Sequence, residues 1–359
     1  LYVANHGDGT VSVVDVPTRS VLATVETGEG PSAVAFAPPP PGGPTPTATP
    51  TTVTPTPTPT IVPTPTAIPA GVAPPERLPP NTVRETFVPG AEFPVAMAFA
   101  PDGRLFYAEL RTGRIRIVEN GVVRSEPFYD FAVSGQPEAG LLGLALDPNF
   151  GENHHVYALY TAVADGGTSD GGPNGPNHVV RLTDVNGRGE DLTPILTGLP
   201  SGQIHNAGSL RFGPDGKLYI TLGETGSMDL AQDLRSPAGK ILRVNPDGSI
   251  PPDNPFAGQP DRFGAIWAYG FRNPFDLDFH PESGALIAGE SGPGDNDELN
   301  VVVEGGNYGW PPSGFQDKPD RIDPIAVVDP VTSPVGVTFY RGDAIPEWRD
   351  SFFYCNFHQ

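Results

Sequence analysis

His205 and Glu224 are the two side chains whose types and spacing could most directly do chemistry. His205 lies in the run Gln-Ile-His-Asn-Ala-Gly-Ser-Leu, and Glu224 closes the strand-turn-strand pattern that follows it. A hairpin between them would place the imidazole and the carboxylate at the same end of a β-fold. An imidazole held by a carboxylate is a general base with a fixed tautomer. A lone histidine is usually structural, so the interpretation depends on the surrounding segments.

Three further segments carry charged or amide side chains. Glu138 stands ahead of Gly-Leu-Leu-Gly, and Arg272 and Asn273 directly precede a proline. The run 289–300 is rich in glycine and acidic residues, and Asn-Tyr-Gly-Trp-Pro follows at 307–311. Each segment also has a structural interpretation: Arg272 could form an ion pair between sheets, and acidic loops are usually solvated. We therefore ask which elements would position them.

One hairpin pattern recurs along the chain. An alternating apolar run leads into a proline-containing turn and then into a second alternating run, typical of β-hairpins. The copies occupy residues 95–107, 144–160, 210–220 and 277–287. No segment shows helical periodicity of useful length. Repeated antiparallel hairpins with insertions between them predict an all-β protein and favour a β-propeller over a β-sandwich, whose strands would be more closely spaced.

The first part of the chain differs in composition. Residues 1–37 contain three strand-like runs and the start of a fourth, and they resemble one blade of the YVTN family of propeller repeats. A single blade cannot bury both faces, so we expect a poorly anchored remnant of a second propeller. Residues 38–80 form a Pro/Thr-rich linker that favours extended polyproline II. The main domain is then expected at 81–359.

Composition limits the partners and the location. The chain has 359 residues and a formal net charge of −21, which argues against nucleic acid or an anionic membrane as a partner. No apolar run approaches the roughly 18–20 residues that a membrane helix needs. The single cysteine, Cys355, excludes an internal disulfide and a cysteine-built zinc site. The Pro/Thr stalk is typical of exported proteins, so we expect an extracellular, periplasmic or cell-surface location.

From about residue 84 to the end, the chain resembles the glucose/sorbosone dehydrogenase family. These are soluble aldose sugar dehydrogenases that use pyrroloquinoline quinone (PQQ) and fold as six-bladed β-propellers. No motif is specific alone; their order and spacing carry the resemblance. The motifs are Gly140-Leu141-Leu142-Gly143, His205 with Gly208, Gly239-Lys240-Ile241-Leu242-Arg243, Arg272-Asn273-Pro274, Gly292-Pro293 with Asp297-Glu298, and Asn307-Tyr308-Gly309-Trp310-Pro311.

The resemblance implies oxidation of an aldose at its anomeric carbon to the lactone. Hydride would pass to PQQ, and the electrons would then go to a separate acceptor. His205 would be the general base, and Glu224 would orient it and stabilise the imidazolium. Arg272 would stabilise charge on the reduced quinone, with Asn273 beside it at the cofactor.

Calcium is the second implied cofactor. The backbone carbonyls of Gly292 and Pro293 would bind a Ca²⁺ that polarises PQQ, since oxygen-only ligation suits a hard cation. Asp297, Glu298 and the Tyr308 carbonyl resemble a second, structural Ca²⁺ site of relatives. The family resemblance also allows a homodimer.

Two positions and the C-terminal end depart from the family pattern. Some relatives carry Gln where Glu138 stands and Gln or His where Ser291 stands, which affects hydrogen bonding around sugar and cofactor. The sequence stops in a strand-like run at 351–357, so the propeller is expected to be incomplete at its C-terminus, without the basic residues that hold the PQQ carboxylates.

One alternative is a non-catalytic propeller that binds carbohydrate or protein. A hydrolase that uses a Ca²⁺-bound water is a third interpretation, but it leaves His205 and Arg272 unexplained.

Overall fold

The computed structural model describes residues 87–164, 174–294, 296–311, 320–328, 333–343 and 345–357, together with the backbone of three strands between residues 2 and 26. The linker predicted at 38–80 and the strand predicted to start near residue 31 lie outside these ranges. In the described part, only α1 (Phe150–Asn153) and the 3-10 turns η1 (Met228–Ala231) and η2 (Pro346–Trp348) are helical. None of these is long and apolar enough to cross a membrane. The predicted all-β class is therefore confirmed.

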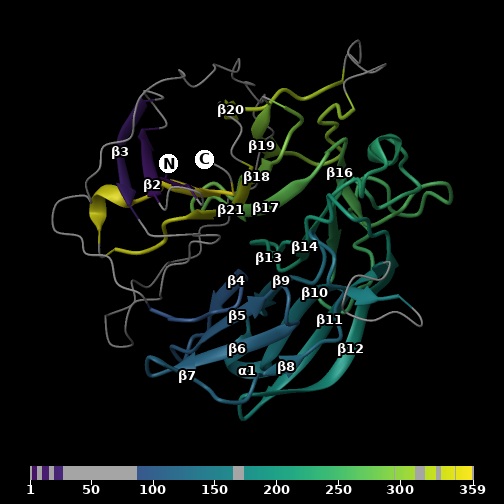
Figure 1. Cartoon of the computed structure of the whole chain (residues 1–359). Coiled ribbons are helices and arrows are strands. Elements are labelled where there is room, and N and C mark those ends of the chain that lie inside the picture. The colour runs from purple at the N-terminus through teal and green to yellow at the C-terminus, as the bar shows by residue number, and fades with distance from the viewer. Residues whose placement is uncertain are drawn as a thin grey trace, which may run out of the picture.

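The strands form five sheets that follow one another around a common centre (Figure 1). The first contains β4 (Pro94–Phe99), β5 (Leu105–Glu109), β6 (Arg114–Glu119) and β7 (Val122–Val123), with β8 (Tyr129–Asp130) paired to β6. The second contains β9 (Leu141–Leu146), β10 (His155–Val163), β11 (Asn174–Val185) and β12 (Arg188–Leu199). The third contains β13 (Leu210–Phe212), β14 (Leu218–Leu222), β15 (Lys240–Val244) and β16 (Ile266–Tyr269). The fourth contains β17 (Pro274–Phe279), β18 (Leu286–Glu290), β19 (Asp297–Val302) and β20 (Ala326–Val328). The fifth joins β21 (Pro334–Phe339) and β22 (Phe352–Asn356) to β1 (Tyr2–Asn5), β2 (Thr10–Asp15) and β3 (Ser20–Glu26).

This arrangement is that of propeller blades. The recurring hairpins of the sequence are β4–β5, β9–β10, β13–β14 and β17–β18, each antiparallel as predicted. Their first strands lie nearest the centre in Figure 1, where the chain enters each sheet. A sixth blade stays a prediction.

The N-terminal strands differ from the expectation in one respect. We expected residues 1–37 to be poorly anchored, but β1 pairs in parallel with β22, with Tyr2 opposite Phe353 and Asn5 opposite Asn356. The exposed edge of β22 offers unpaired backbone groups, which an added strand satisfies. Whether this segment originates from a second propeller stays a prediction.

Each pair of neighbouring sheets shares a hydrophobic core. The largest cluster of buried side chains between the first two sheets includes Phe106, Ile115, Leu144 and Val156. Similar clusters lie between the second and third, third and fourth, and fourth and fifth sheets. Because side chains alternate between the faces of a strand, each inner sheet can bury both faces against its neighbours. The inner strands are thereby held in fixed relative positions.

Two buried aspartates of β17 connect the sheets near the centre. Asp276 accepts a hydrogen bond from Val337 N at 2.7 Å and lies 3.4 Å from Arg211 Nη2. Asp278 accepts bonds of 2.8 Å from both terminal nitrogens of Arg341. Burial raises the pKa of Asp276. Burial acts the same way on Asp278, but the Arg341 hydrogen bonds and the charge of Arg211 outweigh it and lower that pKa.

Lys240 fixes the connection between β14 and β15, the segment that begins with Glu224. Its side chain is fully buried, and Nζ donates to the carbonyls of Leu230, Ala231 and Ala238 at 2.7, 3.0 and 2.7 Å. An ammonium has three donors, so the group is fully satisfied by backbone acceptors. Burial lowers the pKa of Lys240 to about 7.

We expect Lys240→Met to lower the free energy of unfolding by about 2–3 kcal/mol, because three buried carbonyls lose their donor. The lowered pKa also gives a pH dependence. Between about pH 7 and the ordinary value of 10.5, the unfolded chain binds the proton that the folded protein releases, so wild-type stability relative to Lys240→Met rises with pH. Urea unfolding of both proteins across this window measures the difference. A constant difference would show that the buried amine keeps its proton.

Candidate functional site

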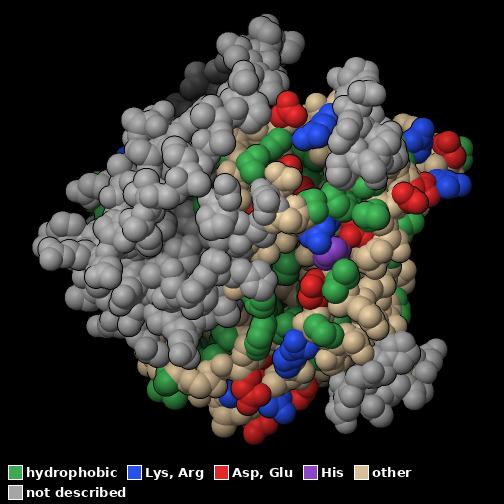
Figure 2. All heavy atoms as spheres, turned by 45° about the horizontal axis from the view of Figure 1, so that its top comes forward, with side chains coloured by type: hydrophobic (Ala, Val, Ile, Leu, Met, Phe, Trp, Pro, Cys, Tyr) green, Lys and Arg blue, Asp and Glu red, His purple; other side chains and the backbone are tan. Residues whose placement is uncertain are grey.

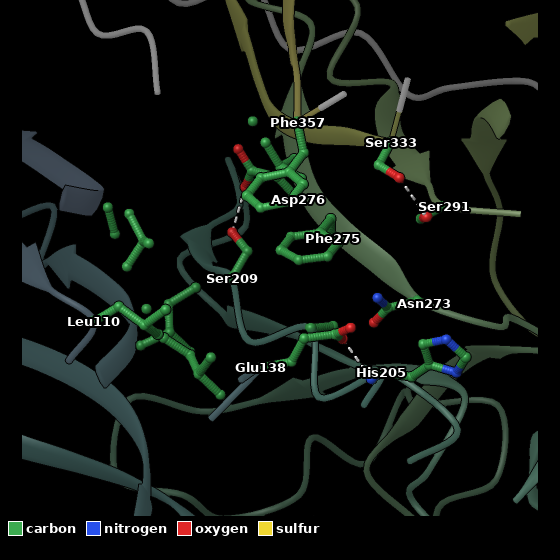
Figure 3. A pocket seen from close by; sticks show the side chains of 18 of the residues that line it. Leu110, Glu138, His205, Ser209, Asn273, Phe275, Asp276, Ser291, Ser333 and Phe357 are labelled. Atoms are coloured by element: carbon green, nitrogen blue, oxygen red, sulfur yellow. Dashed lines mark hydrogen bonds between the residues drawn. The ribbon is translucent and has the colours of Figure 1, made fainter. Parts of the chain in front are cut away.

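A cavity of about 390 Å³ lies between the sheets and is lined by the first strands of all five, β4, β9, β13, β17 and β21. Figure 2 shows one face of the molecule with a hollow in which a histidine lies among basic, acidic and hydrophobic side chains. In Figure 3, Glu138, His205 and Asn273 lie near one another at one end of the cavity. The predicted site residues that line it are Glu138, His205, Arg272, Asn273, Ser291 and Gly292. The structure therefore brings together segments that are far apart in sequence.

The hydrogen bond between His205 Nδ1 and Glu224 Oε1 is the central contact of the site. Glu224 is 1% exposed, and its Oε2 is buried without a hydrogen-bond partner among the described residues. An ionised carboxylate can only accept, so Nδ1 carries the hydrogen and Nε2 carries the lone pair. In the described part of the chain, Nε2 has no partner. The predicted pair is thus formed, and Nε2 is the basic atom.

The backbone of His205 adopts a left-handed conformation. Its φ is +58°, and that of Ala207 is +50°. Such angles cost a non-glycine residue of the order of 1 kcal/mol, so neighbouring contacts must hold them. Glu138 Oε2 accepts a hydrogen bond of 2.6 Å from His205 N, and Thr225 N donates to His205 O at 3.2 Å. Glu138 therefore fixes the base through its backbone.

Two further side chains brace these segments. The buried amide of Asn206 donates to the carbonyls of Glu138 and Gly202 at 2.8 and 2.7 Å, and it accepts from Gly202 N at 2.9 Å. Arg111 donates to the carbonyls of residues 135–137 at 3.2, 2.7 and 2.9 Å. Glu138 and the neighbouring base are therefore held from both sides.

Motif glycines allow backbone segments to approach the base closely. A Cβ on Gly143 would lie 2.0 Å from the carbonyl oxygen of Gly208. A Cβ on Gly223 would lie 2.1 Å from the carbonyl oxygen of His205 and 2.6 Å from Asn273 Oδ1. These distances are far below van der Waals contact, so any side chain would push the His205 segment away from β9 and β14.

Arg272 is connected to the same network. Its carbonyl accepts a hydrogen bond of 2.8 Å from Glu224 N, and its backbone N–H donates to Glu290. The guanidinium donates from Nη1 to Ser291 O at 2.9 Å and lies 5.7 Å from the centre of the Trp310 ring. The backbone of Arg272 thus joins the segment of the base to the end of β18.

Glu290 is a buried acid beneath Arg272 that the sequence analysis did not single out. Burial and the Glu298 carboxylate raise its pKa well above the ordinary range. The two glutamates face each other across β18 and β19, with Asn300 Nδ2 3.5 and 3.3 Å from them. The raised pKa favours the neutral form of Glu290, which leaves the positive charge of Arg272 less compensated. The sequence feature that could have identified Glu290 is its position at the end of a strand, directly before Ser291.

Asn273 presents an unsatisfied group in the cavity wall. The residue is 2% exposed, and among the described residues its Oδ1 has no hydrogen-bond partner. A buried polar atom without a partner costs about 1–3 kcal/mol. The oxygen is enclosed beside the Gly223 backbone, so it does not itself face the cavity.

The structure shows how the loop that contains Gly292, a predicted ligand of the first Ca²⁺, is held in place. Gly292 borders the cavity, and its N–H donates to Asp297 Oδ1 at 3.0 Å. Asp297 Oδ2 accepts from Ser333 N at 2.6 Å, so this carboxylate orders the loop around Gly292. Ser333 lines the cavity opposite Ser291, with the two hydroxyls 3.0 Å apart, and nothing in its sequence neighbourhood indicated this. Pro293 follows Gly292 in the same loop.

The second Ca²⁺ site, expected at Asp297, Glu298 and the Tyr308 carbonyl, stays a prediction. Asp297 and Glu298 are consecutive in β19, so their side chains point to opposite faces of the sheet. Among the described residues, no three acidic, histidine or cysteine side chains are placed to hold a metal ion.

Replacing Glu138 tests its role in holding the base. Glu138→Ala is expected to lower the free energy of unfolding by about 1–2 kcal/mol and to speed hydrogen exchange at the His205 amide, because that N–H loses its acceptor. Glu138→Gln is the matched control, since its amide oxygen can accept the same bond. Equal exchange rates in the wild type and both variants would contradict this role.

Comparison with known proteins identifies one family. The sequence profile described as Glucose / Sorbosone dehydrogenase matches residues 91–359. The aldose sugar dehydrogenase YliI of Escherichia coli is 34% identical over 284 residues, which cover 73% of this chain and 74% of that protein. A crystal structure from Thermus thermophilus, described as a putative glucose dehydrogenase, has a TM-score of 0.65 and 42% identity over 72% of this chain and 76% of that one. The PQQ-bound aldose sugar dehydrogenase of Streptomyces coelicolor has a TM-score of 0.62 and 34% identity over 71% of this chain and 74% of that one. The chain therefore belongs to the glucose/sorbosone dehydrogenase family.

Proposed function

We propose that this protein oxidises an aldose at its anomeric carbon to the lactone, with PQQ as the hydride acceptor. The observation that carries the proposal is the His205–Glu224 pair at the cavity, with Nε2 free to take a proton. Arg272 and the unsatisfied Asn273 amide line the same cavity. The similarity to aldose sugar dehydrogenases supports this choice of reaction.

Each of the site residues has its own role in the proposed reaction. His205 Nε2 takes the proton of the C1 hydroxyl while the C1 hydride leaves, and a carbonyl forms at C1. Glu224 stabilises the imidazolium that results, and Glu138 keeps the ring in place through the His205 backbone. PQQ, when bound, supplies the two-electron acceptor for the hydride. Arg272 provides the positive charge that favours electron density on the acceptor.

The residues present fit an acidic, planar cofactor. Arg272 offers a cation, and Asn273 lies beside it in the cavity wall. Ser291 adds a hydroxyl to the cavity wall. For Ca²⁺, the Gly292 and Pro293 carbonyls are the proposed ligands, because a hard cation prefers oxygen.

The remaining expectations extend this proposal. A second, structural Ca²⁺ site at Asp297, Glu298 and the Tyr308 carbonyl is proposed on the family resemblance. We also propose a separate electron acceptor, a homodimer and an exported location.

Reconstitution tests the proposed reaction. The full-length protein loaded with PQQ and Ca²⁺ should reduce a dye in the presence of an aldose, and His205→Ala should lose about 10²–10⁴-fold in kcat. Chelating the Ca²⁺ should also abolish dye reduction. Binding of PQQ without dye reduction by any aldose would instead favour the alternative, a non-catalytic module that binds carbohydrate or protein.

Glu224→Gln separates charge from orientation. The glutamine oxygen can still accept from Nδ1–H, but it no longer carries the charge that stabilises the imidazolium. We expect kcat to fall by about 10–100-fold with a smaller change in the KM for the sugar. Steady-state kinetics measure both values, and an unchanged kcat would remove Glu224 from the mechanism.

A further inference from the structure

Arg272 is a cation that no carboxylate side chain pairs with in the described structure. Its guanidinium has two contacts: the Ser291 carbonyl at 2.9 Å, and the face of Trp310 at 5.7 Å. Most other arginine–aromatic contacts of the described residues belong to arginines that also form ion pairs, such as Arg243 with Asp253 at 3.0 Å. Arg272 thus depends on an aromatic ring for one of its two contacts.

This choice of contact has a chemical consequence. A carboxylate would hold a guanidinium but would also neutralise its charge, whereas an aromatic face attracts the cation and leaves its charge available. The interaction contributes more when the pair is shielded from water than when it is exposed. An aromatic contact therefore suits a cation whose charge has to act on a neighbouring group.

The backbone of Trp310 is itself held by a defined set of hydrogen bonds. Its backbone N–H donates to Gly270 O at 2.8 Å, and its carbonyl accepts from Gln232 Nε2 at 2.7 Å. Gln232 and Asn307 exchange two hydrogen bonds, from Gln232 Nε2 to Asn307 Oδ1 at 2.9 Å and from Asn307 Nδ2 to Gln232 Oε1 at 3.2 Å. We call these two side chains the amide clasp.

The amide clasp joins two segments that are distant in sequence. Gln232 follows η1, whose Ala231 carbonyl accepts from both Lys240 Nζ and Gly270 N at 3.0 Å. Asn307 precedes Trp310 in the Asn-Tyr-Gly-Trp-Pro motif and also accepts from Gly309 N at 3.0 Å. The connection after Glu224 and the motif at 307–311 therefore fix each other.

We propose that Trp310 is a positioning residue for Arg272, and that the amide clasp of Gln232 and Asn307 holds the backbone of Trp310 in place. The catalytic part of this inference rests on the proposed function, since it assumes that the Arg272 charge acts during the reaction. The geometric part does not. It concerns the guanidinium of the protein without PQQ, and it can be measured there.

The geometric part is tested by NMR on the full-length protein without PQQ. The aromatic ring should shift the Arg272 Nε–H resonance upfield and slow its exchange with water, and Arg272→Lys assigns the signal. Trp310→Leu and Gln232→Ala should both move this resonance toward its random-coil position, whereas Trp310→Phe should keep most of the shift. Arg243, which lies 4.8 Å from Trp267, is the internal control and should not change.

The catalytic part is tested with PQQ, Ca²⁺ and a neutral aldose. Trp310→Leu should lower kcat by about tenfold with the KM for the sugar nearly unchanged, and Trp310→Phe should restore kcat to within about threefold of the wild type. Thermal unfolding of each variant confirms that it is folded.

The outcomes separate the two proposals. An Arg272 resonance unaffected by both Trp310→Leu and Gln232→Ala overturns the positioning role, whatever the activity. Equal kcat losses in the Phe and Leu variants overturn it as well, because ring character would then be irrelevant. A wild-type protein that binds PQQ but oxidises no aldose overturns the proposed function, while the NMR result still decides the geometry.

Discussion

The hydrogen bond between His205 and Glu224 sets the requirements for the rest of the site. To leave Nε2 free, the imidazole must turn Nδ1 toward a carboxylate that is almost completely buried. This places the base on a short segment with left-handed backbone angles, pressed against β9 and β14. Glycines where the backbones touch, and the Glu138 carboxylate that accepts from the His205 N–H, make that conformation tolerable.

The same need to satisfy buried groups explains how charge is distributed around the cavity. Glu224 is paired with the imidazole, Asp276 is surrounded by donors, and the raised pKa of Glu290 favours its neutral form. Arg272, in contrast, meets a carbonyl and an aromatic ring. In a chain with a net charge of −21, a guanidinium at the cavity wall without a carboxylate partner concentrates positive potential at one point of the cavity.

The fold and the base could be predicted because they depend on local patterns. Alternating apolar runs around proline-containing turns identify the four hairpins, the strand-turn-strand spacing pairs His205 with Glu224, and the motif order points to His205 and Arg272. The pairing of β1 with β22 could not be predicted from the sequence. Strand edges pair through backbone hydrogen bonds, which leave no pattern of side chains in the sequence. Asp297, Glu298 and the Tyr308 carbonyl were grouped on the family resemblance, and their Ca²⁺ site stays a prediction. Ser333 and the contact between Trp310 and Arg272 depend on tertiary packing alone.

The cavity is lined by β4, β9, β13, β17 and β21, one strand from each of the five described sheets, so its shape depends on how these sheets are placed relative to one another. No single blade contains enough of the wall to bind a ligand, so a molecule held there contacts several blades at once. Its binding free energy would therefore stabilise the arrangement of several sheets and not one hairpin alone. A bound cofactor would suppress the opening of any one blade, and loss of any one blade would release it.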